Sequence, residues 1–234
     1  MVVTVSREAE SQVEIYGAYE GEILGGSEPR ASGTFTVSGD YLIIVPKNNA
    51  SRPQLEAGSV PTSYIPTYGA TAIRPADTLT VPSANLPYSS TAMSIAMEGL
   101  MTYADDNTAG TPVFARWYAD ANNYILLDVD TDGAATGEVN FNQASAGVVD
   151  TVASSGSALS PSVNVPFKIA SRHGTNFING AVNGTVLTAD TTPTSLPNLS
   201  ATNLTLGHTF NGYISKFRVW GDDIGDDGLL DVTS

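Results

Sequence analysis

Short runs in which apolar and polar residues alternate make up most of the chain. Residues 93–100 (MSIAMEGL) alternate cleanly, as an antiparallel strand with one wet face does. Two further strands, 112–118 and 124–130, flank the polar stretch ADANN and predict a hairpin. Many short strands separated by turns are typical of a β-sandwich. The remaining strands are expected at residues 78–81, 138–142, 167–172, 176–179, 185–188, 203–207 and 212–220.

The chain divides into three parts by its pattern. Residues 1–52 predict a small β region for attachment or oligomerisation, in which 34–38 and 41–45 form a hairpin across Gly39-Asp40. We expect this region to be too short to bury a core alone. Residues 53–77 contain four prolines and predict an extended connector packed against the sandwich as a strap. Residues 78–234 predict the sandwich itself.

The amino-acid composition excludes several classes of partner and site. The net charge is −14, with 10 Lys and Arg against 24 Asp and Glu, which argues against nucleic-acid partners and anionic membrane surfaces. The chain has no cysteine, so disulfides and Cys-based zinc sites are excluded. No signal peptide and no apolar run of membrane-spanning length are recognisable, so membrane insertion is not expected.

Several strings, in order, resemble one family. The connector PQLEAGSVPTSYIPTYGATAIRPAD, the mid-chain FKIA, NF and VNG, the later TSLP and LTLG, and the closing NGYISKFRVW resemble bacteriophage tail-fibre, head-fibre and spike proteins. Their C-terminal domain is a concanavalin A-like, laminin-G-like jelly roll. The resemblance therefore implies an all-β virion protein on the particle surface, with other virion proteins, sister subunits in a homo-oligomer and host polysaccharide as partners.

The hairpin at 116–124 (RWYADANNY) is the best candidate for sugar contact. Aromatic rings stack on the apolar faces of pyranoses, and Asp and Asn suit vicinal hydroxyls on a loop held by a rigid scaffold. The alternative is that one of the two aromatic residues packs into the core, since alternation must bury one of them. The loops at 105–107 and 208–211 come next. The candidates are Trp117, Tyr118, Asp120, Asn122 and Asn123.

The string DVDTDG at 128–133 predicts a weak calcium site through Asp128, Asp130 and Asp132. Alternate carboxylates before a glycine suit a hard cation that prefers oxygen ligands. An EF-hand loop, however, needs a Glu at its twelfth position, which here is Val139. The alternative is a hairpin end where Asp and Gly provide turn geometry.

Catalysis is not expected. Glycosidases of the concanavalin superfamily use paired carboxylates on one strand, and no Glu-x-x-x-Glu string occurs within the predicted sandwich, residues 78–234. His173 and His208 have no nucleophile motif beside them. The sequence favours a structural virion protein whose lectin-like domain binds host glycans for adsorption. The alternative is a decoration or capping protein that binds other virion proteins without recognising sugar.

Overall fold

The computed structural model describes residues 2–8, 12–17, 21–23, 30–38, 41–47, 51–57, 64–67, 70–71, 79–103, 111–131, 137–159 and 165–234. The chain forms two compact units, residues 1–76 and 77–234. Each unit has its own hydrophobic core, and each is described by itself.

The N-terminal unit contains two three-stranded antiparallel sheets. Valines at alternate positions of β1 and β2 turn toward one another, and Val3, Val5, Val13, Ile15 and Phe35 are buried in one cluster. This region therefore buries a core of its own, contrary to the expectation from its length. The first sheet has the order β4 (Arg30–Thr36), β1 (Val2–Glu8), β6 (Ser51–Ala57), and the second β3 (Gly21–Ile23), β2 (Gln12–Gly17), β5 (Leu42–Lys47).

Two expectations for this region are wrong. β4 and β5 do not form a hairpin with each other, because β4 pairs with β1 and β5 pairs with β2 in a different sheet. Residues 53–57 are not an extended connector but part of strand β6. The strap beyond them returns to β6, where Gln54 Oε1 accepts a hydrogen bond of 2.7 Å from the backbone N–H of Ile65. Packing of this strap against the sandwich stays a prediction.

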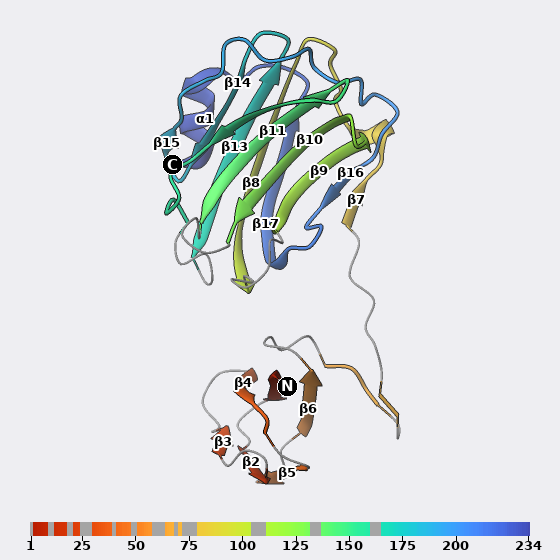
Figure 1. Ribbon diagram of the computed structural model, residues 1–234, viewed down its shortest axis with the longest axis vertical. Helices are drawn as coiled ribbons and strands as arrows, with labels where there is room; N and C mark the ends of the chain where they lie inside the picture. Colours follow the sequence, from red (N-terminus) through yellow and green to blue (C-terminus); the bar gives the residue numbers. More distant parts are fainter. Residues whose placement is uncertain are drawn as a thin grey trace. The chain divides into compact units, whose positions relative to one another are not determined.

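The C-terminal unit is a sandwich of two antiparallel sheets, drawn as two layers in Figure 1. A 3-10 turn, Ser83–Asn85, follows its first strand. The six-stranded sheet has the order β12 (Val148–Ala153), β11 (Glu138–Ser145), β10 (Asn123–Asp130), β9 (Val113–Asp120), β16 (Leu204–Leu206), β7 (Leu79–Val81), and the five-stranded sheet β15 (Thr185–Val186), β14 (Ile178–Val182), β13 (Pro166–Gly174), β8 (Ala92–Tyr103), β17 (Asn211–Trp220).

The core lies between the two sheets and follows the alternation of the sequence. Ile125, Leu127 and Val129 of β10 face inward and are at most 1% exposed. They pack in one cluster with Ile95 and Ile169 of the opposite sheet. The other positions of β10 point away from the core, to the outer face of the six-stranded sheet.

The C-terminal helix α1 (Gly225–Thr233) packs on the outer face of the five-stranded sheet, where Leu229 is buried against three alanines of β8, β13 and β14. Arg172 of β13 holds the turn before it, with ion pairs of 3.1 Å to Asp223 and 2.9 Å to Asp226. In the part of the chain that the structure describes, no helix has the length and apolar character needed to cross a membrane.

Candidate carbohydrate-binding face

A β-bulge decides which aromatic residue of the predicted hairpin is buried. Leu127 pairs with Ala115 and Asp128 with Val113, so Phe114 is an extra residue in β9. The bulge lets Phe114 enter the core, where its ring lies 4.6 Å from that of Phe167. Because Phe114 is the extra residue, Ala115 and Trp117 then face inward, opposite Leu127 and Ile125.

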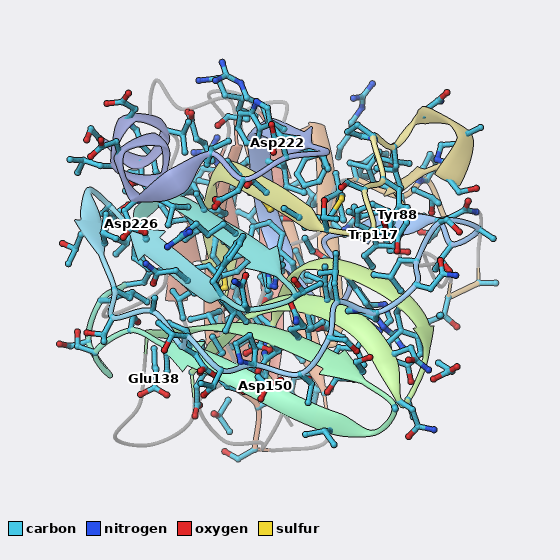
Figure 2. The ribbon with its side chains drawn as sticks, turned by 90° about the horizontal axis from the view of Figure 1, so that it is seen from above. Tyr88, Trp117, Glu138, Asp150, Asp222 and Asp226 are labelled. Atoms are coloured by element: carbon cyan, nitrogen blue, oxygen red, sulfur yellow. The ribbon has the colours of Figure 1, made fainter. Side chains whose placement is uncertain are left out.

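Trp117 is a core residue and not a sugar contact, which corrects one expectation. Its side chain is 1% exposed, and its indole N–H donates a hydrogen bond of 2.9 Å to the carbonyl of Thr202. The ring of Tyr88 meets it edge-on at 6.0 Å, and Figure 2 shows the two residues together at one end of the sandwich. A saccharide cannot stack on a ring enclosed in this way.

The polar residues of the hairpin lie together at its tip, as predicted, but they hold the turn. One carboxylate oxygen of Asp120 accepts hydrogen bonds from the backbone N–H of Asn122 at 2.8 Å and from the Asn123 amide at 3.1 Å. The Asn123 amide oxygen accepts a further bond from the backbone N–H of Ala146 in the neighbouring hairpin. These groups stiffen the rim, and their role as sugar contacts stays a prediction.

Tyr118 faces outward and is part of a partly exposed aromatic platform on the sheet. Its ring stacks on that of Tyr124, with centroids 5.6 Å apart and planes inclined by 21°. The guanidinium carbon of Arg116 lies 3.7 Å from the centroid of Tyr118, a cation–π contact. Arg116 Nη1 also lies 3.4 Å from Nε2 of His208. We call Arg116, Tyr118 and Tyr124 the aromatic platform.

A polar cluster lies beside the platform on the same face. Asp128 lies on the same face of β10 as Tyr124, four residues further along the strand. Its two carboxylate oxygens accept hydrogen bonds from the amides of Asn140 at 3.0 Å and Asn142 at 2.8 Å. Asn142 Oδ1 in turn accepts a bond of 2.7 Å from the Thr151 hydroxyl. The cluster spans β10, β11 and β12, so its geometry is fixed by the backbone ladder rather than by loops.

The Asp128 carboxyl has a perturbed pKa. Burial raises the pKa to about 6, and the two amide hydrogen bonds only partly oppose this effect. The neighbouring carboxylates Asp130 and Glu138, which face each other across β10 and β11, raise the pKa further. Burial, and then the charge of Asp128, also raise the pKa of Tyr124.

The arrangement does not assemble the predicted calcium site from the described residues. Asp128 and Asp130 share one face of β10, but the oxygens of Asp128 already accept two amide donors. Among the described His, Asp and Glu side chains, no three are grouped closely enough to hold a metal ion. Asp132 lies outside the described residues, as does the 105–107 loop, so calcium binding stays a prediction.

The face suits binding better than bond cleavage. A pKa near 6 and two neighbouring carboxylates are features of glycosidase acids. Asp128, however, is only 6% exposed and both of its oxygens are occupied. Glu98 lies on the other sheet, paired with Lys216 at 2.7 Å. What is accessible is a row of ring edges, amides and hydroxyls on a rigid sheet.

Arg116 and Tyr124 lie at the two ends of the hairpin that the sequence singles out, although they are not among its named contacts, whereas Asn140 and Asn142 were missed. A signal was present in EVNFNQ at 138–143, where polar residues alternate with buried Val139 and Phe141. This alternation predicts a strand with a polar outer face, but it does not predict which strand pairs with it. Only the pairing of β11 with β10 brings the two amides to Asp128.

By sequence, the chain matches no protein-family model and no curated protein. Among solved structures, a NanB sialidase from Streptococcus pneumoniae is similar, at 16% identity over 67% of this chain and 27% of that chain, with a TM-score of 0.50. The CBM40 of a Ruminococcus gnavus IT-sialidase, bound to α2,3-sialyllactose, is 17% identical over 62% of this chain and 84% of that chain, with a TM-score of 0.49. A structure of botulinum neurotoxin type C is 10% identical over 61% of this chain and 35% of that chain, with a TM-score of 0.44.

These likenesses concern the fold. The all-β, lectin-like jelly-roll sandwich predicted from the sequence is confirmed. The resemblance to phage fibre and spike proteins stays a prediction. The position of the carbohydrate-binding face rests on the geometry of the sheet described above.

Proposed function

We infer that the sandwich binds a saccharide on the outer face of its six-stranded sheet. The observation that carries this proposal is the aromatic platform beside the polar cluster of Asp128, Asn140 and Asn142. Sugars combine an apolar ring face with a rim of hydroxyls, and a binding surface for them needs the same two elements side by side. Here both come from neighbouring strands of one rigid sheet.

Arg116 extends the proposal to saccharides that carry an acidic group. Among the described residues, none of the carboxylates forms an ion pair with Arg116, although the chain has 24 Asp and Glu. Its guanidinium contacts a ring and an imidazole, so donors remain for a carboxylate or sulfate. An acidic saccharide that avoids Arg116 would meet the repulsion of a protein of charge −14.

The biological setting that we propose is adsorption of a phage particle to host polysaccharide, with the sandwich as the receptor-binding part of a fibre or spike. This rests on the resemblance of the connector and the closing strand to such proteins. The N-terminal unit would attach the subunit to the particle. Exposed apolar side chains on its second sheet, Tyr16 and Ile43, and Tyr41 just before β5, give it a surface for that contact.

A glycan array that carries matched neutral and acidic saccharides tests the binding site. Tyr118→Ala should weaken binding about tenfold, equivalent to about 1.4 kcal/mol, without unfolding the sandwich. Tyr213→Ala is the matched control, because this tyrosine is 69% exposed on the other sheet. Arg116→Gln should lose acidic saccharides preferentially. Unchanged binding by Tyr118→Ala would place the site elsewhere.

The structural alternative predicts a different result. A decoration or capping protein should bind no saccharide on the array, and particles that lack it should still adsorb to host cells at the normal rate. Adsorption that falls when the subunit is removed, and that soluble saccharide inhibits, would support the receptor-binding role instead.

A further inference from the structure

Among the described strands, β12 is an edge of the six-stranded sheet, and no described backbone group bonds to its outer side, so we call it the open edge. The turn between β11 and β12 has two residues, Ala146 and Gly147, both with positive φ, so Ser145 and Val148 are a hydrogen-bonded pair. From there on, every second residue of β12, at positions 148, 150 and 152, forms backbone hydrogen bonds with β11. The bond from Ser154 N–H to the Val139 carbonyl continues this series. The main-chain groups of the residues between them point to the free edge, at positions 149, 151 and 153.

This edge lacks the features that protect other sheet edges. β17, at an edge of the five-stranded sheet, has a bulge after Ile214 and carries exposed Lys216 and Arg218. Cations and bulges keep a second strand away. β7 and β15 are only three and two residues long. β12 has six residues, an unbroken register, and no cation or proline, and Val148 and Val149 are 52% and 48% exposed.

Its one charged residue is turned inward. Asp150 lies on the core side of β12, and one of its oxygens accepts hydrogen bonds from the backbone N–H and the hydroxyl of Thr194. The outward side of β12 therefore carries no charged side chain, although Asp190 lines the adjoining hollow and the whole chain carries −14. Two copies of so acidic a chain repel each other over most of their surfaces, and a neutral strand is where they can approach.

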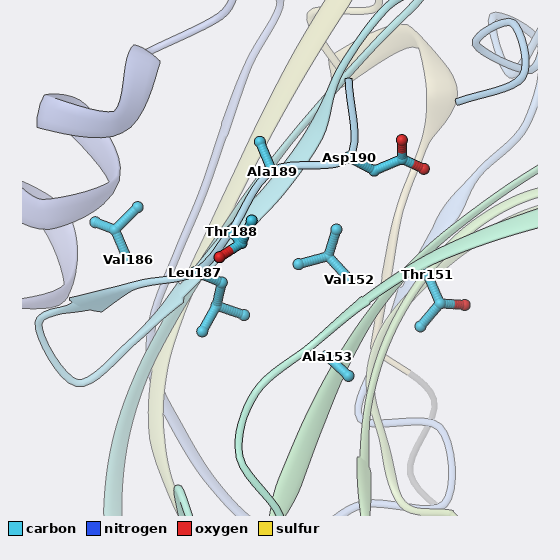
Figure 3. Close-up of a pocket in the computed structure, with 8 residues that line it drawn as sticks. All are labelled: Thr151, Val152, Ala153, Val186, Leu187, Thr188, Ala189 and Asp190. Atoms are coloured by element: carbon cyan, nitrogen blue, oxygen red, sulfur yellow. The ribbon is translucent and has the colours of Figure 1, made fainter. Parts of the chain in front are cut away.

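A hollow of about 560 Å³ lies between β12 and residues 186–190. Figure 3 shows its lining, in which the apolar Val152, Ala153 and Leu187 lie together with the polar Thr188 and Asp190. Val148 also lies on the core side of β12, yet half of its side chain remains exposed. A strand added to this edge brings an apolar side chain to the hollow.

We propose that β12 pairs with β12 of a second copy of this chain, in antiparallel register about a two-fold axis at Thr151. Only residues 149, 151 and 153 have main-chain groups at the edge, so they must oppose each other. The register that pairs Thr151 with its equivalent sets Val149 against Ala153 of the second copy. It also directs Val148 of each copy toward the other copy's hollow, so the edge is self-complementary.

The pairing has a functional consequence that rests on the proposed saccharide site. An antiparallel strand added edge to edge continues the sheet and keeps its outer face on the same side. The two aromatic platforms would then face one way across a twelve-stranded sheet. Two weak sites that face the same surface bind more tightly than either one, through effective concentration.

The association is measured on the full chain by sedimentation equilibrium, with no saccharide present, so that the result is independent of the proposed function. We expect a monomer–dimer equilibrium that strengthens with added salt, because salt screens the repulsion between like-charged copies. Val149→Lys should weaken the dimer at least about tenfold, since an edge lysine opposes strand pairing. Tyr213→Lys, at the edge strand β17, is the matched control and should leave the dimer unchanged.

A second variant and a second measurement keep the test decisive. Thr151→Pro removes an N–H from the open edge without removing a backbone bond to β11, although it loses the hydroxyl bond to Asn142, and should also give monomer. Amide hydrogen exchange should slow at Val149, Thr151 and Ala153 as wild-type concentration rises. A wild type that is monomeric up to about 1 mM would overturn the proposal. So would a dimer that Val149→Lys leaves intact and whose three edge amides exchange at the monomer rate.

Discussion

Acid should unfold the sandwich through one buried histidine, His173. Its side chain is fully buried on the core side of β13, where Nε2 lies 3.0 Å from the hydroxyl of Ser171. Nδ1 has no hydrogen-bond partner among the described residues. Burial lowers the pKa of His173 from 6.5 to about 3, because a charged imidazole in this core would lose its hydration.

The sign and size follow from linkage. Above about pH 6.5 the imidazole is neutral in both states and makes no pH-dependent contribution. Between that value and about pH 3, the unfolded chain binds a proton that the folded chain does not, so the free energy of unfolding falls as pH falls. At pH 5 the loss is about 2 kcal/mol, and at pH 3 it reaches about 5 kcal/mol at 1.36 kcal/mol per unit.

Urea unfolding followed by tryptophan fluorescence measures this loss. Both tryptophans, Trp117 and Trp220, lie in the sandwich, so the signal reports that unit. His173→Gln keeps a polar side chain that can reach toward Ser171 but does not titrate. The difference in free energy of unfolding between wild type and variant, measured at several pH values, cancels the contribution of every other group.

We expect this difference to be constant above about pH 7 and to shift by about 2 kcal/mol in favour of the variant at pH 5. A difference that stays flat from pH 7 to pH 5 would show that His173 already titrates normally in the folded protein. A shift with the opposite sign would mean that the folded state holds the charged imidazole, and both results would refute the reasoning.

Three further changes test the fold and the face. In the wild type, the raised pKa of Asp128 makes the folded state bind a proton first, so the free energy of unfolding should rise by up to about 3 kcal/mol as pH falls from 6 to 3.8. This effect is opposite in sign to that of His173. Asp128→Asn should remove it, as urea unfolding at several pH values would measure. Arg172→Ala should lower the free energy of unfolding by about 1–2 kcal/mol, because it releases two partly exposed carboxylates, Asp223 before helix α1 and Asp226 in its first turn. Gly180→Ala should destabilise by about 1–3 kcal/mol, since its Cβ would meet the Phe141 ring at 2.2 Å, and thermal unfolding detects both changes.

Local patterns determined much of the sandwich. The hairpin across residues 119–123 is present as β9 and β10, and the alternating segment 93–100 lies within β8. These elements depend on periodicity and on turn residues that are adjacent in sequence. In each case the signal and the structure span the same few residues.

What the sequence did not determine depends on partners far along the chain. The hairpin predicted at 34–45 was wrong because β1 and β2, more than twenty residues earlier, compete for the same two strands. The orientation of Trp117 depends on the bulge at Phe114, and a bulge is visible only against the strand that it opposes. The same limit applies to the carbohydrate-binding face, since Asn140 and Asn142 of β11 become part of it only because β11 pairs with β10, which carries Asp128.

The two groups with the most perturbed pKa values differ in what they imply. His173 lies between the sheets, out of reach of any ligand, and its polar contact is within its own strand, so its perturbation is a property of the core. Asp128 lies on the outer face beside the platform, and its ionised form costs the protein about 3 kcal/mol at neutral pH. A carboxylate that lowers stability, held by two amides on a sheet face with exposed aromatic edges, is what a binding position requires. Asp128 is itself buried with both oxygens occupied, so it acts by holding the amides of Asn140 and Asn142 in place. The Asp128→Asn variant should therefore weaken saccharide binding by releasing these amides, while it gains stability at neutral pH.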